Sequence, residues 1–480
     1  ENPGELDPAK MIPRDVYALP QYDWQDEMYR TAISNSHIIS ITGGTKDTKY
    51  AGSIGYTKEQ GLLRNNDYTR VTGRLRLDHS HKRLNFSLNL NGSYSIYNGA
   101  ANSGAGYNNM GVLQSAIVSR PLVFNNPHDL ETQGGWKEPT RNLDYVYKQT
   151  TAPNFTASTT VSYQLLDGLY LSSTVSGTVA PSNCHEFYSK ETPWGWYLKG
   201  RASISNSSWA GYDNINALNY SKDFKNDTRL NVMAAFQISG SKYVTSSIVK
   251  SNFADETTGV FDINKGVTLE SATSNAGPQR SMSYLARVNY TVFDRYLFTA
   301  SFRADGSDRF GENNRWGYFP SAAFAWRISD EPWLKDVRQI DNLKLRLSYG
   351  VTGNSNIPIF QYMAHMGDSF YGDDLGLRPT SMPNPDLKWE TTTQYNIGLD
   401  LSCWNSAFNF TFDIYDKRTT NMLYEAIIPA QSGFKSQWQN LGEVDNRGIE
   451  IGINSRNIST KNFSWTTSFT VAANRNRVLE

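Results

Sequence analysis

The stretch Leu84-Asn85-Phe86-Ser87-Leu88-Asn89-Leu90-Asn91-Gly92-Ser93-Tyr94-Ser95-Ile96-Tyr97 alternates between apolar and polar side chains. Successive side chains of a strand point to opposite faces of a sheet, so this stretch predicts a strand with one apolar face and one hydrated, uncharged face. A transmembrane β-barrel needs such strands, because one face meets lipid and the other meets a watery lumen.

The same alternation recurs along the chain, at residues 70–78, 169–179, 230–238, 343–349, 395–402 and 408–414. Several runs reach the roughly 9–11 residues that a tilted strand needs to cross a bilayer. No comparably long stretch shows the 3.6-residue period of a helix. The sequence therefore predicts an all-β fold, an antiparallel transmembrane β-barrel.

Composition agrees with this class and restricts the alternatives. The chain has 480 residues, of which 39% are hydrophobic and 13% aromatic, and 46 basic residues balance 46 acidic ones. The mean hydropathy of −0.54 resembles that of a soluble protein, but barrel strands are half polar and hide their membrane character. Because no run of about 18 apolar residues exists, a helical membrane protein is excluded. The balanced charge gives no sign of a nucleic-acid partner.

Short and long connections alternate between the predicted strands, and the long ones fall at about 98–152, 181–215, 240–280, 351–388 and 417–440. Outer-membrane barrels have short periplasmic turns and long outer loops, so this alternation predicts the orientation of the barrel. We expect about sixteen strands in residues 37–480. Residues 1–36 are rich in proline and predict an extended lead-in, in which Asp23 caps a short helix carrying Trp24 and Met28.

Several sequence blocks carry a family resemblance. They are Asp23–Glu27, His37–Asp78, Phe302–Ser307, Arg309–Gly311, Arg315–Ser321, Ala325–Arg327, Leu345–Gly350, Thr352–Asn354, Asn384–Glu390, Asp413–Tyr415, Gly442–Val444 and Asn446–Glu450. With these blocks the chain resembles the barrel region of a SusC/RagA-type TonB-linked outer-membrane protein, a TonB-dependent transporter of Bacteroidota.

The resemblance implies a barrel of roughly 22 strands closed by a plug, in the outer membrane of a Gram-negative bacterium. It also implies a SusD-like surface lipoprotein as a lid, an oligosaccharide or peptide ligand, and energy delivered by the TonB complex. Of these roughly 22 strands, about 16 are expected in this chain. The plug domain, the TonB-contacting segment and the C-terminal strands are expected to be missing, so the chain is expected to be a fragment.

Two function classes stay open. The first is TonB-dependent import of oligosaccharides or peptides. The alternative is an outer-membrane receptor or adhesin barrel that binds a ligand without transporting it. No catalytic motif is present, so no enzyme activity and no cofactor are expected.

Aromatic residues in the long loops are the candidates for ligand binding, because flat rings stack on sugars and anchor peptide side chains. They are Trp194, Trp196, Trp209, Tyr212, Phe434 and Trp438. The tryptophans favour a glycan. The alternative roles are an interfacial aromatic girdle, packing between loops, and contacts with a lid protein.

Charged residues on the polar strand faces form a second group: Arg74, Arg76, Arg287, Lys344, Arg346, Asp400 and Asp413. On the lipid face such charges would cost about 2–4 kcal/mol near the bilayer midplane, so we expect them to face the lumen and to hold a plug. Direct contact with a ligand is the alternative.

No metal site is predicted. The acidic stretch Asp305–Asp308 lacks the ligand order of a calcium loop, and His79 and His81 have no evident third ligand. Cys184 and Cys403 are expected to be free thiols.

Overall fold

The structure, a computed structural model, describes residues 22–99, 111–119 and 138–479. Within these residues, sixteen antiparallel strands form one sheet in the order β1 to β12, β15, β16, β19, β20. Two further pairs, β13–β14 and β17–β18, form separate hairpins. The all-β antiparallel prediction and the count of about sixteen sheet strands are confirmed. The prolines of residues 1–20 and parts of the predicted 98–152 loop lie outside the described residues.

The sheet strands are β1 (Ser34–Gly44), β2 (Thr48–Gln60), β3 (Asp67–His81), β4 (Leu84–Asn98), β5 (Val146–Leu166), β6 (Leu169–Tyr188), β7 (Arg201–Phe224), β8 (Thr228–Phe253), β9 (Gly266–Val292), β10 (Tyr296–Ser307), β11 (Trp316–Arg327), β12 (Ile340–Asn354), β15 (Glu390–Cys403), β16 (Phe408–Thr420), β19 (Val444–Ser459) and β20 (Ser464–Val478). The hairpin strands are β13 (Met366–Tyr371), β14 (Asp374–Pro379), β17 (Leu423–Ile427) and β18 (Ser436–Asn440). The helices are α1 (Trp24–Met28), α2 (Val112–Val118), α4 (Arg141–Asp144) and α5 (Pro193–Leu198), with 3₁₀ turns η4 (Gly259–Lys265), η5 (Glu312–Asn314), η6 (Ile328–Asp330) and η7 (Ala430–Ser432).

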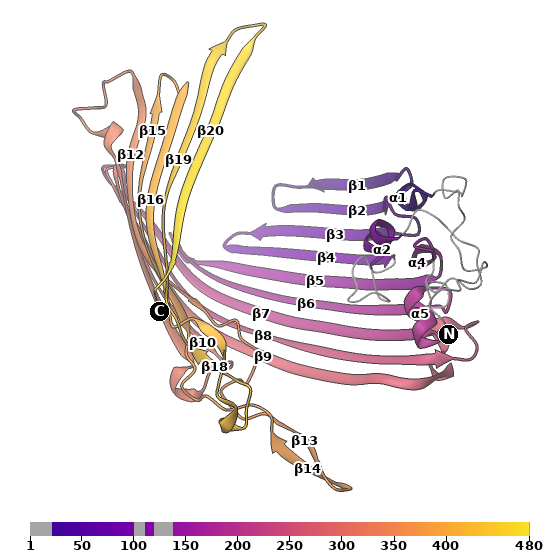
Figure 1. Ribbon diagram of the computed structural model, residues 1–480. Coiled ribbons are helices and arrows are strands. Elements are labelled where there is room, and N and C mark those ends of the chain that lie inside the picture. The colour runs from indigo at the N-terminus through magenta and orange to yellow at the C-terminus, as the bar shows by residue number, and fades with distance from the viewer. Residues whose placement is uncertain (1–21, 100–110, 120–137, 480) are drawn as a thin grey trace, which may run out of the picture.

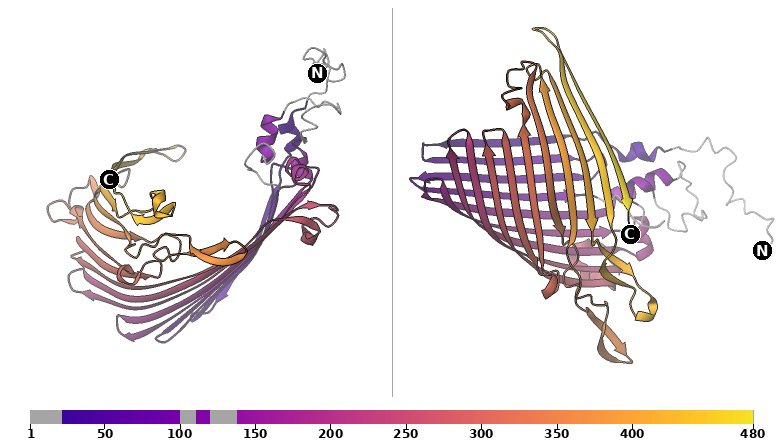
Figure 2. Two further views of the ribbon diagram at one scale, coloured as in Figure 1. Left: turned by 60° about the horizontal axis from the view of Figure 1, so that its bottom comes forward. Right: turned by 90° about the vertical axis from the view of Figure 1, so that its left-hand side faces the viewer.

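The sheet twists and curves into an open trough whose two edges are β1 and β20 (Figures 1 and 2). Every neighbouring pair is antiparallel, and the turns at one end are short, as at 45–47, 82–83 and 167–168. The sequence predicts short connections at the same places, at 43–49, 78–83 and 166–168. In the described residues, no helix is long and apolar enough to cross a bilayer.

The strands β5 to β9 are taller than predicted. β8 has 26 residues and β9 has 27, against the roughly 9–11 needed to cross a bilayer. The predicted loops 181–215 and 240–280 are therefore wrong, since the connections are only 189–200 and 254–265. Above the apolar band both faces of the sheet meet water, so apolar and polar side chains need not alternate there. Pairing between neighbouring strands still satisfies the backbone N–H and C=O groups.

Register sorts the side chains into one apolar face and one polar face. Phe298 lies opposite Tyr290 on one side and Phe324 on the other, and Phe324 lies opposite Leu347, which makes a continuous apolar row. β7 interrupts the apolar face with Asn214 and Asn216. The Asn216 amide donates to Asn214 at 2.7 Å, and Asn214 donates to the Thr174 carbonyl at 3.1 Å, which satisfies both groups.

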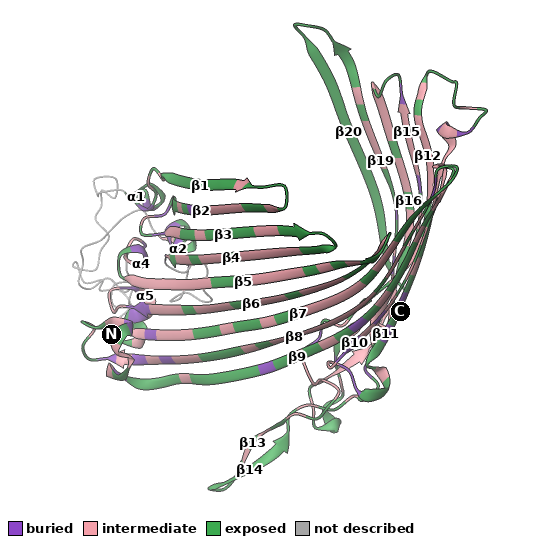
Figure 3. Ribbon diagram, turned by 180° about the vertical axis from the view of Figure 1, so that it is seen from behind, coloured by how far each residue is buried: buried purple, intermediate pink, exposed green. Residues whose placement is uncertain are grey.

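Most sheet residues are intermediate or exposed, and the buried side chains gather at the end with the long connections (Figure 3). One cluster there joins Trp24 and Met28 of α1 to Leu63, Val112 and Leu143. The cap that starts α1 is the predicted one, because the Asp23 carboxylate accepts from two backbone N–H groups of the first turn.

Candidate functional site

An aromatic platform lies on the polar face of the long strands β5 to β9, which we call the tall wall. The indole of Trp209 on β7 covers Gly211, where an added β-carbon would come within 2.5 Å of the ring. Across the ladder from Trp209 is Tyr243, whose ring covers Gly277 in the same way. Without side chains at these two glycines, both rings can lie against the backbone. Trp209 keeps 43% of its surface exposed.

Beside Trp209 is a cavity of about 260 Å³. Its other walls are mostly hydroxyl groups with one carboxylate and one amide: Ser176, Thr178, Ser239, Ser241, Ser281, Asp213 and Gln279. The volume is below the roughly 300–1,000 Å³ of pockets for drug-sized ligands, so it fits one ring of a larger molecule. An apolar ring face beside hydrogen-bonding groups suits a flat ligand that carries hydroxyls.

Hydrogen bonds fix Asp213. Its Oδ2 accepts from the Gln237 amide at 2.6 Å, and the Gln237 carbonyl accepts from Arg303 at 3.4 Å. Arg303 also donates to Asp305 at 2.7 Å and to the Ser283 hydroxyl at 3.1 Å. This network crosses four strands, β7 to β10, and positions the carboxylate before a ligand arrives, which lowers the entropic cost of binding.

Arg309 fixes Gln279, the amide of the cavity. One terminal nitrogen of Arg309 donates to the Gln279 carbonyl at 2.9 Å, which leaves the Gln279 N–H groups to point elsewhere. The other donates to the backbone carbonyls of Ser355 and Ile357 in the connection after β12. Burial lowers the pKa of Arg309 and raises the pKa of the neighbouring Asp308 carboxyl. Arg309 therefore links the cavity to two loops.

Those loops meet in the loop-root cluster, which we define as Phe310, Ile357 and Leu387. Tyr362, Trp389, Leu423 and Trp438 pack around it. Phe310 and Leu387 have no exposed surface, so three connections share one small core. The hairpin β13–β14, which belongs to the connection between β12 and β15, projects away from the sheet (Figures 1 and 2).

The predicted aromatic residues do not form one site. Trp194 in α5 packs on Tyr188, with ring centroids 4.7 Å apart, and lies 4.3 Å from the Arg201 guanidinium. Trp196, also in α5, is 41% exposed. Tyr212 is three residues from Trp209 on the same strand, and its ring covers Gly240 on the opposite face.

Phe434 and Trp438 lie in another part of the molecule. Trp438 is on β18 and contacts the loop-root cluster, and its backbone carbonyl accepts from the Asn384 amide at 2.7 Å. Phe434 is in the connection between η7 and β18. Of the six predicted aromatics, Trp209 is the one whose ring borders the cavity on the polar face. Asp213, Tyr243 and Gln279 were missed, because all three lie in the segments 181–215 and 240–280, which the sequence predicts to be loops.

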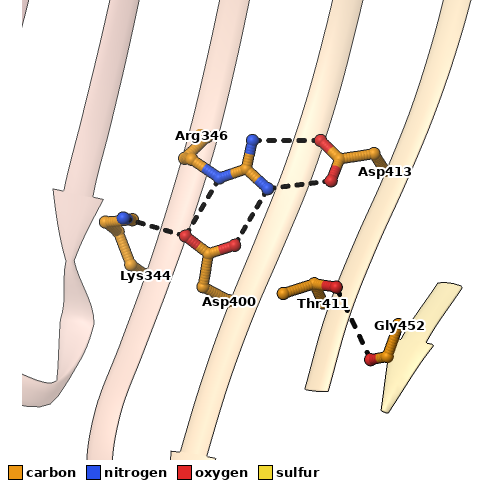
Figure 4. Close-up of polar contacts among 6 residues, drawn as sticks. All are labelled: Lys344, Arg346, Asp400, Thr411, Asp413 and Gly452. Carbon is orange, nitrogen blue, oxygen red and sulfur yellow. Dashed lines mark hydrogen bonds and ion pairs between the residues drawn. The ribbon is translucent and has the colours of Figure 1, made fainter. Parts of the chain in front are cut away.

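Four of the predicted charged residues, on three neighbouring strands, form a neutral network (Figure 4). Arg346 on β12 binds Asp400 on β15 at 3.0 and 2.9 Å, and Asp413 on β16 at 3.0 and 2.9 Å. Lys344 adds an ion pair with Asp400 at 2.8 Å. Both carboxylates are bound by the guanidinium fork, which is the strongest arrangement for such pairs.

The remaining predicted charges are spread over the sheet. Arg76 pairs with Asp78 at 2.7 Å on β3, and Asp78 also accepts from the Ser87 hydroxyl at 2.6 Å. Arg74 lies on the same face two residues away. Arg287 on β9 lies opposite Ser301, in the polar rows of the sheet.

No group of three or more histidine, cysteine or acidic side chains could hold a metal ion in the part of the chain that the structure describes. His79 instead pairs with Thr48, whose hydroxyl lies 2.8 Å from its Nδ1. Cys184 on β6 and Cys403 at the end of β15 are free thiols.

Comparisons with known proteins agree with this architecture. A family model described as "TonB dependent receptor-like, beta-barrel" matches residues 17–478. The TonB-dependent receptor SusC of Bacteroides thetaiotaomicron is 30% identical over 97% of this chain and 49% of its own length. The TonB-dependent receptor P39 of Formosa agariphila is 30% identical over 95% of this chain and 44% of its own length.

Among solved structures, the RagAB peptide transporter is similar, with a TM-score of 0.83 and 22% identity over 95% of this chain and 52% of that one. The fold also resembles FpvA of P. aeruginosa, with a TM-score of 0.59 and 10% identity over 93% of this chain and 55% of that one. The chain thus spans about half the length of the relatives that it matches.

Proposed function

Because the chain belongs to the β-barrel family of TonB-dependent receptors and is of the SusC/RagA type, we propose that the protein actively imports an oligosaccharide across the bacterial outer membrane. Proteins of this family are outer-membrane β-barrels, and the two-faced sheet suits that location, with its apolar face toward lipid and its polar face toward a lumen. TonB would supply the energy.

The Trp209 cavity is the observation that favours an oligosaccharide over a peptide. Its aromatic platform, carboxylate, amide and hydroxyls provide stacking and hydrogen bonds for one sugar ring. Asp213 and Gln279 are held by other protein groups, so specificity would come from their fixed positions. A peptide is the second candidate ligand, and the test below separates the two.

A SusD-like surface lipoprotein is the proposed partner. The hairpin β13–β14 carries large apolar side chains in solvent: Phe370, Tyr371, Leu375 and Leu377. Phe370 is 73% exposed and Tyr371 is 90% exposed. Phe370, Leu375 and Leu377 share one face of the hairpin, and Tyr371 is on the other. Large exposed apolar side chains that share a face mark a protein contact. We propose that the lid docks here.

A plug is the proposed neighbour of the polar face. Arg346 and Lys344 already balance Asp400 and Asp413, so this network would offer a plug hydrogen bonds rather than net charge. The open edges of β1 and β20 support the further proposal that additional strands complete the barrel, because unpaired edges are a liability in any sheet.

Uptake by cells that carry the full-length receptor tests the proposal. Labelled oligosaccharides and labelled peptides are offered with and without a functional TonB system, to the parent protein and to Trp209→Ala. Trp333→Ala is the matched control, since Trp333 is 65% exposed in the connection between β11 and β12.

We expect TonB-dependent uptake of an oligosaccharide that falls in Trp209→Ala and not in Trp333→Ala. Uptake of peptides alone would overturn the substrate class. Binding without TonB-dependent uptake would overturn transport and favour a receptor or adhesin.

A further inference from the structure

The apolar face of β8 and β9 ends in two cations at the same height. On β8 the apolar positions run from Leu230 through Ile238 to Gly240, and the next residue on that face is Lys242. On β9 the run that rises from Tyr290 ends at Arg280. These runs have the length that a tilted strand needs to cross a bilayer, about 9–11 residues. The two cations therefore stand at the upper border of the lipid-facing band.

Lys242 and Arg280 are neighbours across the ladder. Lys242 lies opposite Pro278, and Arg280 lies opposite Gly240, which makes the two cations a diagonal pair with α-carbons roughly 7–8 Å apart. Both side chains are exposed, and neither forms an ion pair with a residue that the structure describes. The Asp308 carboxylate accepts from the backbone N–H of Arg280 at 2.8 Å and holds this part of β9 to the end of β10.

Aromatic rings lie just below the cations on the same face. Tyr284 stacks with Trp316 at 5.9 Å between ring centroids and contacts Phe236 at 5.1 Å. Aromatic rings gather where the hydrocarbon of a membrane meets its headgroups. Arg280 and Lys242 follow two and three positions higher on that face, at the headgroup end of the band.

A groove of about 730 Å³ runs beside the two cations. Its floor consists of small residues and its walls of larger apolar ones: Ala157, Gly177, Ala210 and Gly240 below, and Phe155, Val179, Tyr212 and Pro278 around them. Phe155 and Tyr212 are 53% and 54% exposed. This shallow apolar groove lies on the lipid-facing surface and has positive charge at its upper end. Its shape and charge are therefore complementary to an anion that carries an acyl chain.

We propose that Lys242 and Arg280 bind the phosphate of an acylated lipid from the outer leaflet, with one acyl chain in the groove. Basic side chains at a membrane border recognise phosphate headgroups, and each contributes a factor of roughly five in affinity. The guanidinium fork of Arg280 can bind two phosphate oxygens, while Lys242 adds a point charge. This site is on the face opposite the Trp209 cavity and does not depend on the transported ligand.

Native mass spectrometry of the full-length receptor in mild detergent tests the site. The probes are dimyristoyl phosphatidic acid, dimyristoyl phosphatidylcholine of equal chain length, and inorganic phosphate. The variants are Lys242→Gln with Arg280→Gln, which removes the charges, and Ala210→Leu, which fills the groove floor. Lys46→Gln with Lys225→Gln is the charge-matched control, since both lysines are exposed in short turns at the other end of the sheet.

We expect the parent and the control to bind phosphatidic acid in preference to phosphatidylcholine. The Lys242/Arg280 variant should bind it about twenty-five-fold more weakly, from two factors of roughly five. Ala210→Leu should also weaken it, and inorganic phosphate should not compete. Equal binding by the Lys242/Arg280 variant and the control would overturn the proposal. So would competition by inorganic phosphate, which would point to a site for the free ion.

Discussion

The Trp209 indole occupies the space in which Gly211 would carry a side chain, since a β-carbon at Gly211 would lie 2.5 Å from Cη2 of the ring. The platform on the polar face thus depends on a glycine two residues further along β7. Both residues face the same side of the sheet because side chains alternate along a strand.

Gly211→Val should therefore displace the indole and weaken oligosaccharide binding. We expect an affinity loss of about tenfold, or roughly 1.4 kcal/mol, as one aromatic contact is removed. Isothermal titration of the purified full-length receptor measures it. Gly73→Val on β3 is the control, because a β-carbon there would have no atom within 4 Å and the residue does not line the cavity. Equal affinities in the two variants would contradict the role of Trp209.

Arg346→Met should destabilise the wall formed by β12, β15 and β16. The change leaves Asp400 and Asp413 without their shared guanidinium. We expect a cost of about 1–3 kcal/mol, less than the roughly 3–5 of a fully buried pair because the Arg346 side chain is 34% exposed. Thermal unfolding in detergent measures the change. The triple variant that adds Asp400→Asn and Asp413→Asn should regain most of the loss, and a failure to do so would argue against a charge-based origin.

Phe310→Ala should loosen three loops together. Phe310 is fully buried in the loop-root cluster with Ile357 and Leu387. Truncating a buried phenylalanine costs about 3–5 kcal/mol, and here the loss falls on the loops rather than on the sheet. Limited proteolysis should show faster cleavage in the connections after β10, β12 and β16. Phe370→Ala on the exposed hairpin is the control, and cleavage confined to one connection would show that the loops do not share a core.

Low pH should make the connection between β8 and β9, residues 254–265, more mobile. We call this connection the tip. The Lys265 ammonium and Thr257 bind the Asp255 carboxylate, which lowers the pKa of Asp255 below its ordinary value. A lowered pKa means that the contribution to stability is present above the ordinary carboxyl range, near 4, and is lost as the pH falls below it.

A nitroxide at Thr258→Cys, with Cys184 and Cys403 replaced by serine, reports the mobility of this tip. We expect it to be immobile at pH 7 and to become mobile only as the pH falls well below about 4, because the lowered pKa keeps the Asp255 carboxylate charged near that pH. Asp255→Asn should be mobile at both values. A parent tip that stays immobile in acid would show that this ion pair does not hold it.

The sequence predicted the fold where lipid constrains the chain. In β4, Leu84–Asn98, every second residue must suit hydrocarbon, so alternation alone located the strand to within one residue. Above the membrane that constraint ends. Residues 203–208 are mostly serine on both faces of β7, so this part of the strand was predicted to be loop. The upper parts of these long strands are therefore held by backbone hydrogen bonds between strands, and the pattern of side chains does not reveal them.

The candidate site was predicted only in part, for the same reason. Trp209 and Tyr212 are close in sequence and were grouped, but strand geometry puts them on opposite faces. Asp213 and Gln279 come from strands 66 residues apart in sequence, and the β7–β8–β9 register that joins them cannot be derived from composition. The Arg346 network was recognised as charged residues on a polar face, whereas its mutual pairing emerges only from the register of three strands.

The most direct measurement of the central proposal is purification of the full-length receptor from outer membranes in mild detergent, followed by mass spectrometry of everything retained. We predict a stoichiometric surface lipoprotein and a bound oligosaccharide, and we expect the oligosaccharide to be absent when the cells are grown without that carbohydrate. A receptor that purifies without a lipoprotein and without a ligand would contradict lidded import of an oligosaccharide.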